Sequence, residues 1–311
     1  MDDQQRILIT GSTGYIGKHL VASLAAKNYE LIVISSNERR AKEMLPEKVK
    51  VYDWKSAHMI TEEYGKIDIV INLAGANIGK KRWTKDSKKQ LIESRIATTE
   101  KLADLLLKLK EKPSLWIQAS AIGYYGFNKV RISDENASKG SGFLADLTEK
   151  WEKSTEHISA AGIQLVFLRL GVVLDPSGSF LKPFLVFRKL KLGSGVGRGS
   201  KYLSWIHLYD LVQLVEYTIE KKNARIINAV APTPIKMREL NAVLKEHFNL
   251  ILTLRVPKIF LFIFIGKEKT KELLLADQYI GSAFLPVSDF TFHYNTFEEV
   301  FTKGNFNTIQ R

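Results

Sequence analysis

The chain has 311 residues, 45% of them hydrophobic, and a formal net charge of +13. Its length is sufficient for one large or two modest cores, so we expect two lobes. The absence of cysteine excludes disulfides, thiolate metal sites and cysteine nucleophiles, and it suits a reducing compartment. Because the lysines are scattered without a zinc-finger, RNP or basic-zipper pattern, we predict a solvated basic surface and no nucleic-acid partner.

Neither the first residues nor the longest apolar run resembles a targeting or membrane segment. The start, MDDQQR, is acidic and polar, unlike a secretory signal, so we expect a cytoplasmic location. The run at 259–265 has far fewer residues than the roughly 18 needed to cross a bilayer. It predicts a buried helix and no membrane partner.

Short β-branched runs alternate with longer amphipathic segments through the first half of the chain. Helices are expected at 15–27 and 84–110. The predicted strands are 6–10, 30–35, 49–52, 68–73 and 115–120. This alternation implies right-handed crossovers and a parallel sheet covered on both faces, which is a doubly wound α/β (Rossmann) fold.

The second half continues this pattern and then loses it. A helix at 142–161 and a strand at 163–168 extend the sheet, and a helix at 208–220 with a strand at 225–229 adds to it. After Pro232 the rhythm fades. We therefore predict a dinucleotide-binding domain at 1–170, rejoined by 205–230, and a smaller substrate lobe made of 171–204 and 231–311.

Three glycines stand where the first strand gives way to the first helix. Gly11 permits a tight turn, Gly14 lets the backbone approach a diphosphate, and Gly17 allows close packing of helix on sheet. The helix N-terminus adds unpaired N–H groups that favour an anion. The residues predicted to contact a dinucleotide are Gly11, Ser12, Thr13, Gly14, Tyr15, Ile16 and Gly17. The alternative is an ordinary glycine-rich turn.

The GxxGxxG spacing resembles the extended, epimerase-like branch of the short-chain dehydrogenases/reductases. "INLAGANI" is similar to the segment that lines the cofactor in this branch, which implies contacts from Leu73, Ala74 and Gly75. Asp53 follows the third strand, where such proteins place an acid against the adenine. "QASAIGYYG" resembles the Ser…Tyr-Gly segment of the branch.

Longer stretches, including "GVVLDPSGSF", "SWIHLYDLV" and "LLLADQYIGSAFLPVSDFTFHYNTFEEV", resemble the NAD-dependent epimerase/dehydratase-like (SDR39U1-like) proteins. The resemblance covers nearly the whole chain. It implies a nucleotide-dependent oxidoreductase or epimerase, and it does not supply the substrate.

The end of the second strand, "VISSNERRAK", bears on the choice of nucleotide. An acid here would bind the ribose 2′-hydroxyl of NAD and repel a 2′-phosphate, whereas arginine favours NADP. Ser35 and Ser36 offer uncharged hydrogen bonds, and Arg39 and Arg40 follow. We therefore predict that NADP(H) is favoured over NAD(H). The alternative is that both arginines only solvate a helix.

The Tyr and Lys four residues apart that this superfamily uses for proton transfer are missing from the helix after the fifth strand. The corresponding pair is Phe143 with Leu147, or Leu144 with Thr148. Tyr125 and Lys129 match the spacing, but Gly126 and Asn128 predict a turn there. The remaining candidates for catalysis are Ser120, Tyr124 and Tyr125.

Three further polar residues are candidates for binding the substrate or cofactor. His207 can transfer a proton near neutral pH; alternatively, it braces a helix together with Asp210. Arg198 stands in a glycine run, at 193–199, that predicts a hairpin or mobile loop facing an anionic substrate; surface solubility explains this charge equally well. Arg95 faces the cofactor or pairs with Glu93 or Glu100.

Two functions fit these observations. The first is an NADP(H)-binding oxidoreductase or epimerase acting on a small, anionic or nucleotide-linked substrate. The second is a nucleotide-sensing regulatory protein, for which the missing Tyr–Lys pair is the main argument. No metal-ligand set is predicted, and the sequence does not indicate an oligomeric state.

Overall fold

The computed structural model describes residues 4–175, 180–185, 187–196 and 199–303. Its centre is a seven-stranded sheet in the order β12-β7-β5-β4-β1-β2-β3, in which every neighbouring pair is parallel. The strands are β1 (Arg6–Thr10), β2 (Glu30–Ser35), β3 (Lys50–Asp53), β4 (Ile69–Asn72), β5 (Leu115–Ala121), β7 (Gln164–Leu170) and β12 (Ile226–Ala229). The predicted doubly wound α/β fold is confirmed.

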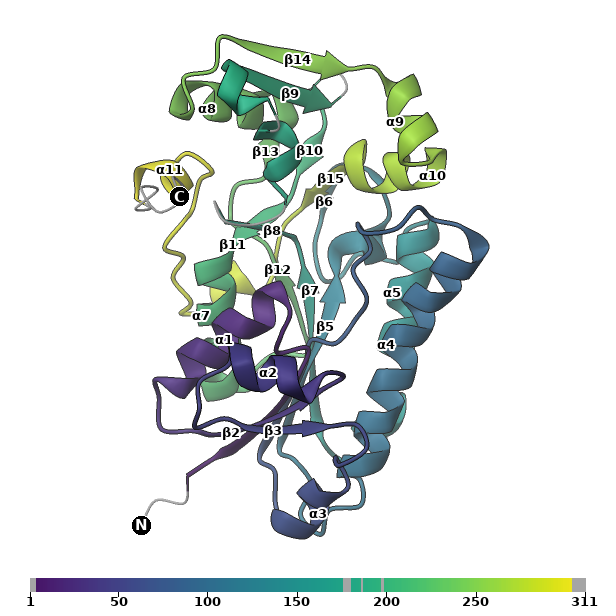
Figure 1. Ribbon diagram of the computed structural model, residues 1–311, viewed down its shortest axis with the longest axis vertical. Coiled ribbons are helices and arrows are strands. Elements are labelled where there is room, and N and C mark those ends of the chain that lie inside the picture. The colour runs from purple at the N-terminus through teal and green to yellow at the C-terminus, as the bar shows by residue number, and fades with distance from the viewer. Residues whose placement is uncertain (1–3, 176–179, 186, 197–198, 304–311) are drawn as a thin grey trace.

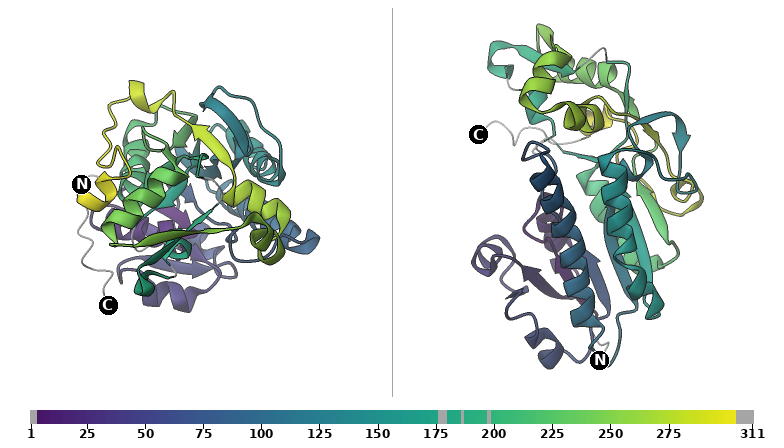
Figure 2. Two further views of the ribbon diagram at one scale, coloured as in Figure 1. Left: turned by 90° about the horizontal axis from the view of Figure 1, so that it is seen from above. Right: turned by 90° about the vertical axis from the view of Figure 1, so that its right-hand side faces the viewer.

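Helices cover both faces of this sheet (Figures 1 and 2). Ile7 and Ile9 of β1 pack with α1 (Tyr15–Ala25), α2 (Glu38–Met44) and α7 (Leu208–Lys221). Leu8 points to the opposite face, into a core that it shares with α3 (Met59–Glu63), α4 (Lys85–Leu106) and α6 (Glu156–Ala160). The period of two along a strand thus divides the apolar residues between two cores.

The helix predicted at 142–161 is divided into α5 (Phe143–Lys153) and α6. The hydroxyl of Ser154 donates to the carbonyl of Trp151 at 2.7 Å, and that of Thr155 donates to the carbonyl of Glu152 at 2.6 Å. Such bonds offer the backbone an alternative to continuing the helix. The two hydroxyl residues therefore account for the break.

A smaller upper lobe stands over the carboxyl ends of the strands (Figure 1). Its paired strands are β8 (Val172–Leu174) with β11 (Trp205–His207), β9 (Leu192–Val196) with β14 (Leu252–Val256), β10 (Tyr202–Leu203) with β13 (Ile235–Lys236), and β6 (Asn128–Ser133) with β15 (Asp277–Ile280). Its helices are α8 (Met237–His247), α9 (Lys258–Phe264), α10 (Lys267–Lys269) and α11 (Glu299–Thr302). Short turns of 3-10 or π helix are η1 (Ile122–Tyr125), η2 (Lys182–Leu185), η3 (Arg188–Leu190), η4 (Thr270–Leu274) and η5 (Leu285–Val287). The division into domains at the predicted boundaries stays a prediction.

The apolar run at 259–265 is helical, but the prediction that it is buried was wrong. In α9 only Leu261 is buried, whereas the exposed fractions of Phe260 and Phe264 are 51% and 75%. The helix lies at the edge of a small lobe, which cannot cover all of its faces. Within the described residues, no helix has the length and apolarity required to span a bilayer.

Two carboxylates bind the C-terminal segment after η5 to α7, which packs on the main sheet. Asp210 lies on α7 and Asp289 lies on the segment. Asp210 is buried and accepts backbone N–H groups from His293 and Tyr294 at 2.8 and 3.0 Å. Asp289 is exposed and accepts from the Tyr217 hydroxyl and the Lys221 ammonium at 2.6 and 2.5 Å. The pair offers a comparison of a buried anchor with an exposed one.

We expect Asp210→Asn to lower the free energy of unfolding by about 1–3 kcal/mol, because one buried N–H then faces an amide donor instead of an oxygen. Asp289→Asn, the matched control, should lower it much less, because its ion pair with Lys221 is exposed. Urea unfolding of both variants measures the difference. Equal losses would show that Asp210 is not the stronger anchor.

Candidate functional site

The glycine loop between β1 and α1 is shaped by two close backbone contacts. Gly11 has φ +72°, and a Cβ there would lie 2.6 Å from the backbone of Leu73. A Cβ on Gly17 would lie 2.3 Å from the Gly11 oxygen. These contacts are the tight turn and the close packing that the spacing predicts. Gly14 is different, because its Cβ would meet only the Gly11 oxygen, at 3.1 Å.

The N-terminus of α1 is open to a ligand. Gly14 is its N-cap, no side chain caps the helix, and no acidic residue stands in its first turn. The first N–H groups of a helix have no partner within it and carry partial positive charge. The Ser12 hydroxyl in the same loop is buried without a hydrogen-bond partner among the described residues. These donors suit an anion such as a diphosphate.

A buried polar cluster holds the turn after β4 beside this loop. The Asn72 side chain accepts from the Thr10 hydroxyl at 2.6 Å and donates to Thr99 and Gln118 at 2.9 and 3.0 Å. The same oxygen accepts the Ala74 N–H at 3.2 Å. The predicted Leu73–Ala74–Gly75 segment is thereby placed against Gly11. Sequence reasoning missed Asn72, although a polar residue ending a buried strand was a usable signal.

The end of β2 carries no carboxylate. The Ser35 hydroxyl bonds to the backbone of Asn37, whose side chain caps α2, and Ser36 is exposed. Arg39 is 91% exposed and pairs with Glu43 at 3.1 Å. Such an exposed pair is weak, so Arg39 can change partners at little cost. Glu38, in the first turn of α2, is bound to Lys42 at 2.6 Å.

Asp53 organises its own turn at the end of β3. One carboxylate oxygen accepts N–H groups from Lys55 and Ser56, both at 2.8 Å, and the Ser56 hydroxyl at 3.0 Å. The hydrogen bonds from Ser56 lower the pKa of Asp53. Its predicted contact with an adenine stays a prediction.

Two of the three predicted catalytic residues lie in a buried network around Arg169. The Ser120 hydroxyl is 2.5 Å from Glu152, which also binds Arg169 through two hydrogen bonds of 2.8 Å. Tyr125 has no exposed surface, and its phenol donates to Asn228 and accepts from Arg169, both at 2.8 Å. Burial raises the pKa of Tyr125. In this arrangement neither hydroxyl is open to a substrate.

Tyr124 is the predicted catalytic residue with access to solvent. Its side chain is partly exposed, and the Arg169 guanidinium lies 3.6 Å from the centre of its ring. The network therefore holds the ring in place and leaves part of the side chain accessible.

Helix α5 has no Tyr–Lys pair at the corresponding positions. Leu144 packs against Gly123, and the Thr148 hydroxyl is buried and donates to the carbonyl of Leu144 at 2.7 Å. Tyr125 ends η1, whereas Lys129 belongs to β6, with Gly126 at φ +80° between them. The two residues therefore do not share a helix face.

His207 caps α7. Its Nδ1 accepts the Tyr209 N–H at 3.1 Å, and its ring lies 3.9 Å from that of Tyr294. Burial lowers the pKa of His207 to about 4, so the ring is neutral at neutral pH. The bracing alternative matches this geometry, and a contact with substrate stays a prediction.

Arg198, the other predicted substrate contact, lies outside the described residues. In the described part of the glycine run that contains it, residues 193–196 belong to β9, which pairs in parallel with the distant strand β14 and does not form a hairpin there. A hairpin would need an antiparallel neighbouring strand.

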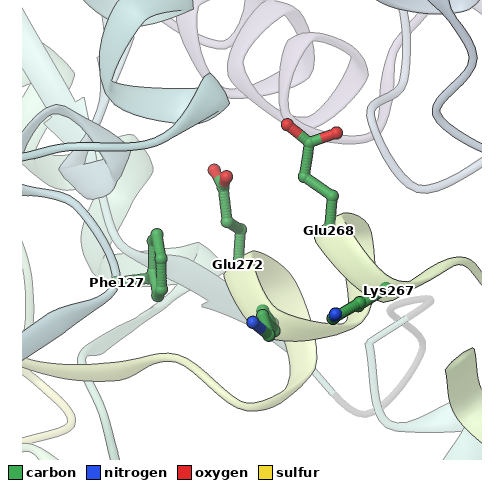
Figure 3. A pocket seen from close by; sticks show the side chains of 5 residues that line it. Phe127, Lys267, Glu268 and Glu272 are labelled. Carbon is green, nitrogen blue, oxygen red and sulfur yellow. The ribbon is translucent and has the colours of Figure 1, made fainter.

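The segment from α10 to η4 attaches the upper lobe to α5 and to the β4–α4 loop. Glu272 is buried and accepts the N–H groups of Phe143 and Leu144, both at 2.9 Å, which caps α5. The Lys269 ammonium donates to two carbonyls of the β4–α4 loop at 2.8 Å, and Lys88 pairs with Glu268 at 2.9 Å. Figure 3 shows Glu268 and Glu272 projecting from this segment beside a small pocket.

Comparisons with known proteins place this geometry in a family. Residues 7–229 match the NAD dependent epimerase/dehydratase family. The epimerase family protein Mb2239 of Mycobacterium bovis is 34% identical over 94% of this chain and 95% of its own. YfhF of Bacillus subtilis, also described as an epimerase family protein, is 34% identical over 84% of this chain and 86% of its own.

A solved structure agrees with these relatives. Human epimerase family protein SDR39U1 (isoform 2), crystallised with NADPH, superposes with a TM-score of 0.77 at 25% identity, covering 89% of this chain and 90% of its own. The chain therefore belongs to the NAD dependent epimerase/dehydratase family, as an extended short-chain dehydrogenase/reductase similar to SDR39U1.

Proposed function

We propose that the protein binds NADP(H) at the Gly11–Gly17 loop and acts as an oxidoreductase or epimerase on a small anionic or nucleotide-linked substrate. The observation that carries this proposal is the uncapped N-terminus of α1, with the buried and unsatisfied Ser12 hydroxyl beside it. NADPH in the human SDR39U1 structure supports the same cofactor here.

The residues present fit a dinucleotide. The N–H groups of Thr13, Tyr15 and Ile16 and the Ser12 hydroxyl would hold its diphosphate. The backbone from Leu73 to Gly75, fixed by Asn72, would bound the other side of the cleft. The bound cofactor would supply or accept a hydride.

Tyr124 is the proton donor that we propose, since it alone of the three candidates combines a phenol with solvent access. The Arg169 guanidinium lies 3.6 Å from the centre of its ring and holds the ring in place. Ser120 and Tyr125 act through the buried network as positioning residues. Steady-state NADPH oxidation with a panel of small carbonyl compounds tests this activity.

A second function, a nucleotide-sensing regulatory protein, is favoured by one specific observation. Leu144 and Thr148 are one of the two pairs at which the Tyr–Lys pair is expected, and both are engaged in packing or in the helix backbone. Tight NADPH binding without turnover on any carbonyl would support this alternative.

We expect Gly14→Val to abolish NADPH binding without unfolding the protein. The Cβ of residue 14 meets little protein, so the added methyl groups would occupy the space where the diphosphate passes. Calorimetry measures the affinity, and the melting temperature checks the fold. Unchanged affinity in a folded variant would show that the diphosphate lies elsewhere.

NADPH should bind more tightly than NADH by roughly tenfold to a hundredfold, because a charge-assisted contact to a 2′-phosphate contributes about 1.5–3 kcal/mol. Arg39→Ala, or its combination with Arg40→Ala, should remove most of this preference. Competition binding of both nucleotides measures it. Equal affinities of the wild type for the two nucleotides, or a preference for NADH that persists in both variants, would contradict the assignment.

Tyr124→Phe should reduce any turnover at least tenfold while NADPH affinity stays within about threefold, under 0.7 kcal/mol. Tyr125→Phe is the matched control, because it removes a hydroxyl that Asn228 and Arg169 use in the core. It should lower the melting temperature, whereas Tyr124→Phe should not. Full turnover in Tyr124→Phe would exclude this residue as the proton donor.

A further inference from the structure

Arg95 is a buried cation with no acidic partner among the described residues. It lies on α4 with an exposed fraction of 9%, and Nη1 donates to the carbonyl of Leu91, in the same helix, at 3.0 Å. Its Nε is buried and has no hydrogen-bond partner among the described residues. Neither predicted glutamate forms an ion pair with it in the part of the chain described, and Glu93 instead lies 3.6 Å from Lys89.

Arg169 shows how the same fold treats a buried arginine when it stabilises the core. Its side chain is 3% exposed, and Glu152 neutralises it through two hydrogen bonds of 2.8 Å. Among the residues that the structure describes, Arg95 has no counterpart to Glu152. Burial alone lowers the pKa of Arg95, to about 10, so the group remains charged at neutral pH. An unpaired buried charge destabilises a protein, and such groups cluster at functional sites.

The position of Arg95 connects it with the proposed cofactor site. A Cβ on Gly75 would lie 3.1 Å from the Arg95 guanidinium carbon, so this glycine lets the backbone lie against the cation. Gly75 is exposed, and the preceding Leu73 and Ala74 pack on Gly11. Arg95 therefore lies at the edge where the β4 turn meets the glycine loop.

A second unsatisfied donor lies beside it. The Arg95 guanidinium is 5.0 Å from the centre of the Trp151 ring, and Trp151 Nε1 is buried with no hydrogen-bond partner within the described residues. Trp151 comes from α5, so the two donors are contributed by facing helices. Guanidinium and indole N–H groups can donate and cannot accept. Their common complement is an anionic or carbonyl oxygen.

We propose that Arg95 and Trp151 form an anion subsite of the cleft, which takes a carboxylate or phosphate oxygen of the bound ligand. The oxygen belongs either to the cofactor diphosphate or to an acidic group of the substrate. This inference rests on the proposed function for the identity of the ligand. The presence of the subsite can be tested without any nucleotide.

The first experiment compares the melting temperatures of wild type, Arg95→Met and Arg169→Met in chloride buffer and with inorganic phosphate at matched ionic strength. Phosphate should stabilise the wild type, because a ligand of the folded state raises the melting temperature. Arg95→Met should lose most of that gain, yet melt no lower than wild type in chloride. Arg169→Met, the matched control, should melt lower in chloride because Glu152 is left unpaired.

A structural role for Arg95 predicts the opposite pattern. If Arg95→Met and Arg169→Met are destabilised alike in chloride, or if Arg95→Met keeps the full gain from phosphate, the proposal is wrong. Arg95→Lys retains a charge without the planar group, and it should recover only part of the phosphate effect.

The second experiment identifies the source of the oxygen. A tenfold or greater loss of NADPH affinity in Arg95→Met assigns it to the cofactor. Unchanged NADPH affinity, with at least a tenfold loss of phosphate affinity in the NADPH-saturated protein, assigns it to the substrate. If neither affinity changes, the subsite does not exist. Failure of the wild type to bind NADPH would overturn the proposed function instead, while the phosphate comparison still decides on the subsite.

Discussion

The ion pair between Arg169 and Glu152 is the constraint on which the carboxyl end of the sheet depends. It joins β7 to α5 within the core, where breaking such a pair by removing one partner is strongly destabilising. Glu152 also accepts a hydrogen bond from Ser120, and Arg169 also donates one to Tyr125. Ser120 and Tyr125, for which the family resemblance implies a catalytic role, therefore form hydrogen bonds that stabilise the fold.

Helix α5 is consequently fixed at both ends. Glu152 holds its last turns to the sheet, and Glu272 caps its first turn from the upper lobe. Burial raises the pKa of Glu272, but two N–H groups of the helix compensate its buried carboxylate. The helix on which the family resemblance predicts the catalytic pair is thus held both to the sheet and to the upper lobe.

The parts of the fold that follow from local pattern were predictable, and those that depend on distant partners were not. β-branched runs place the strands and the Gly11–Gly17 spacing places the loop, because the strand periodicity and the packing of Gly17 on the Gly11 oxygen involve residues close together in the sequence. Ser120 stands in the expected segment, but no pattern indicates that its hydroxyl faces Glu152. The exposure of α9 could not be predicted either. A run of seven apolar residues does not indicate how many other residues of the small lobe pack against it.

The unsatisfied polar groups follow a path through the site. Ser12 lies in the glycine loop next to Gly11, which packs on the turn after β4. That turn leads to Gly75, which borders Arg95. Arg95 in turn lies over the ring of Trp151. Folded proteins satisfy nearly all buried polar atoms, and those left over call for a specific explanation. A ligand that supplies oxygens along this path would satisfy them together. Binding and stability would therefore be coupled through the same atoms, since the ligand would add acceptors that the described residues do not supply.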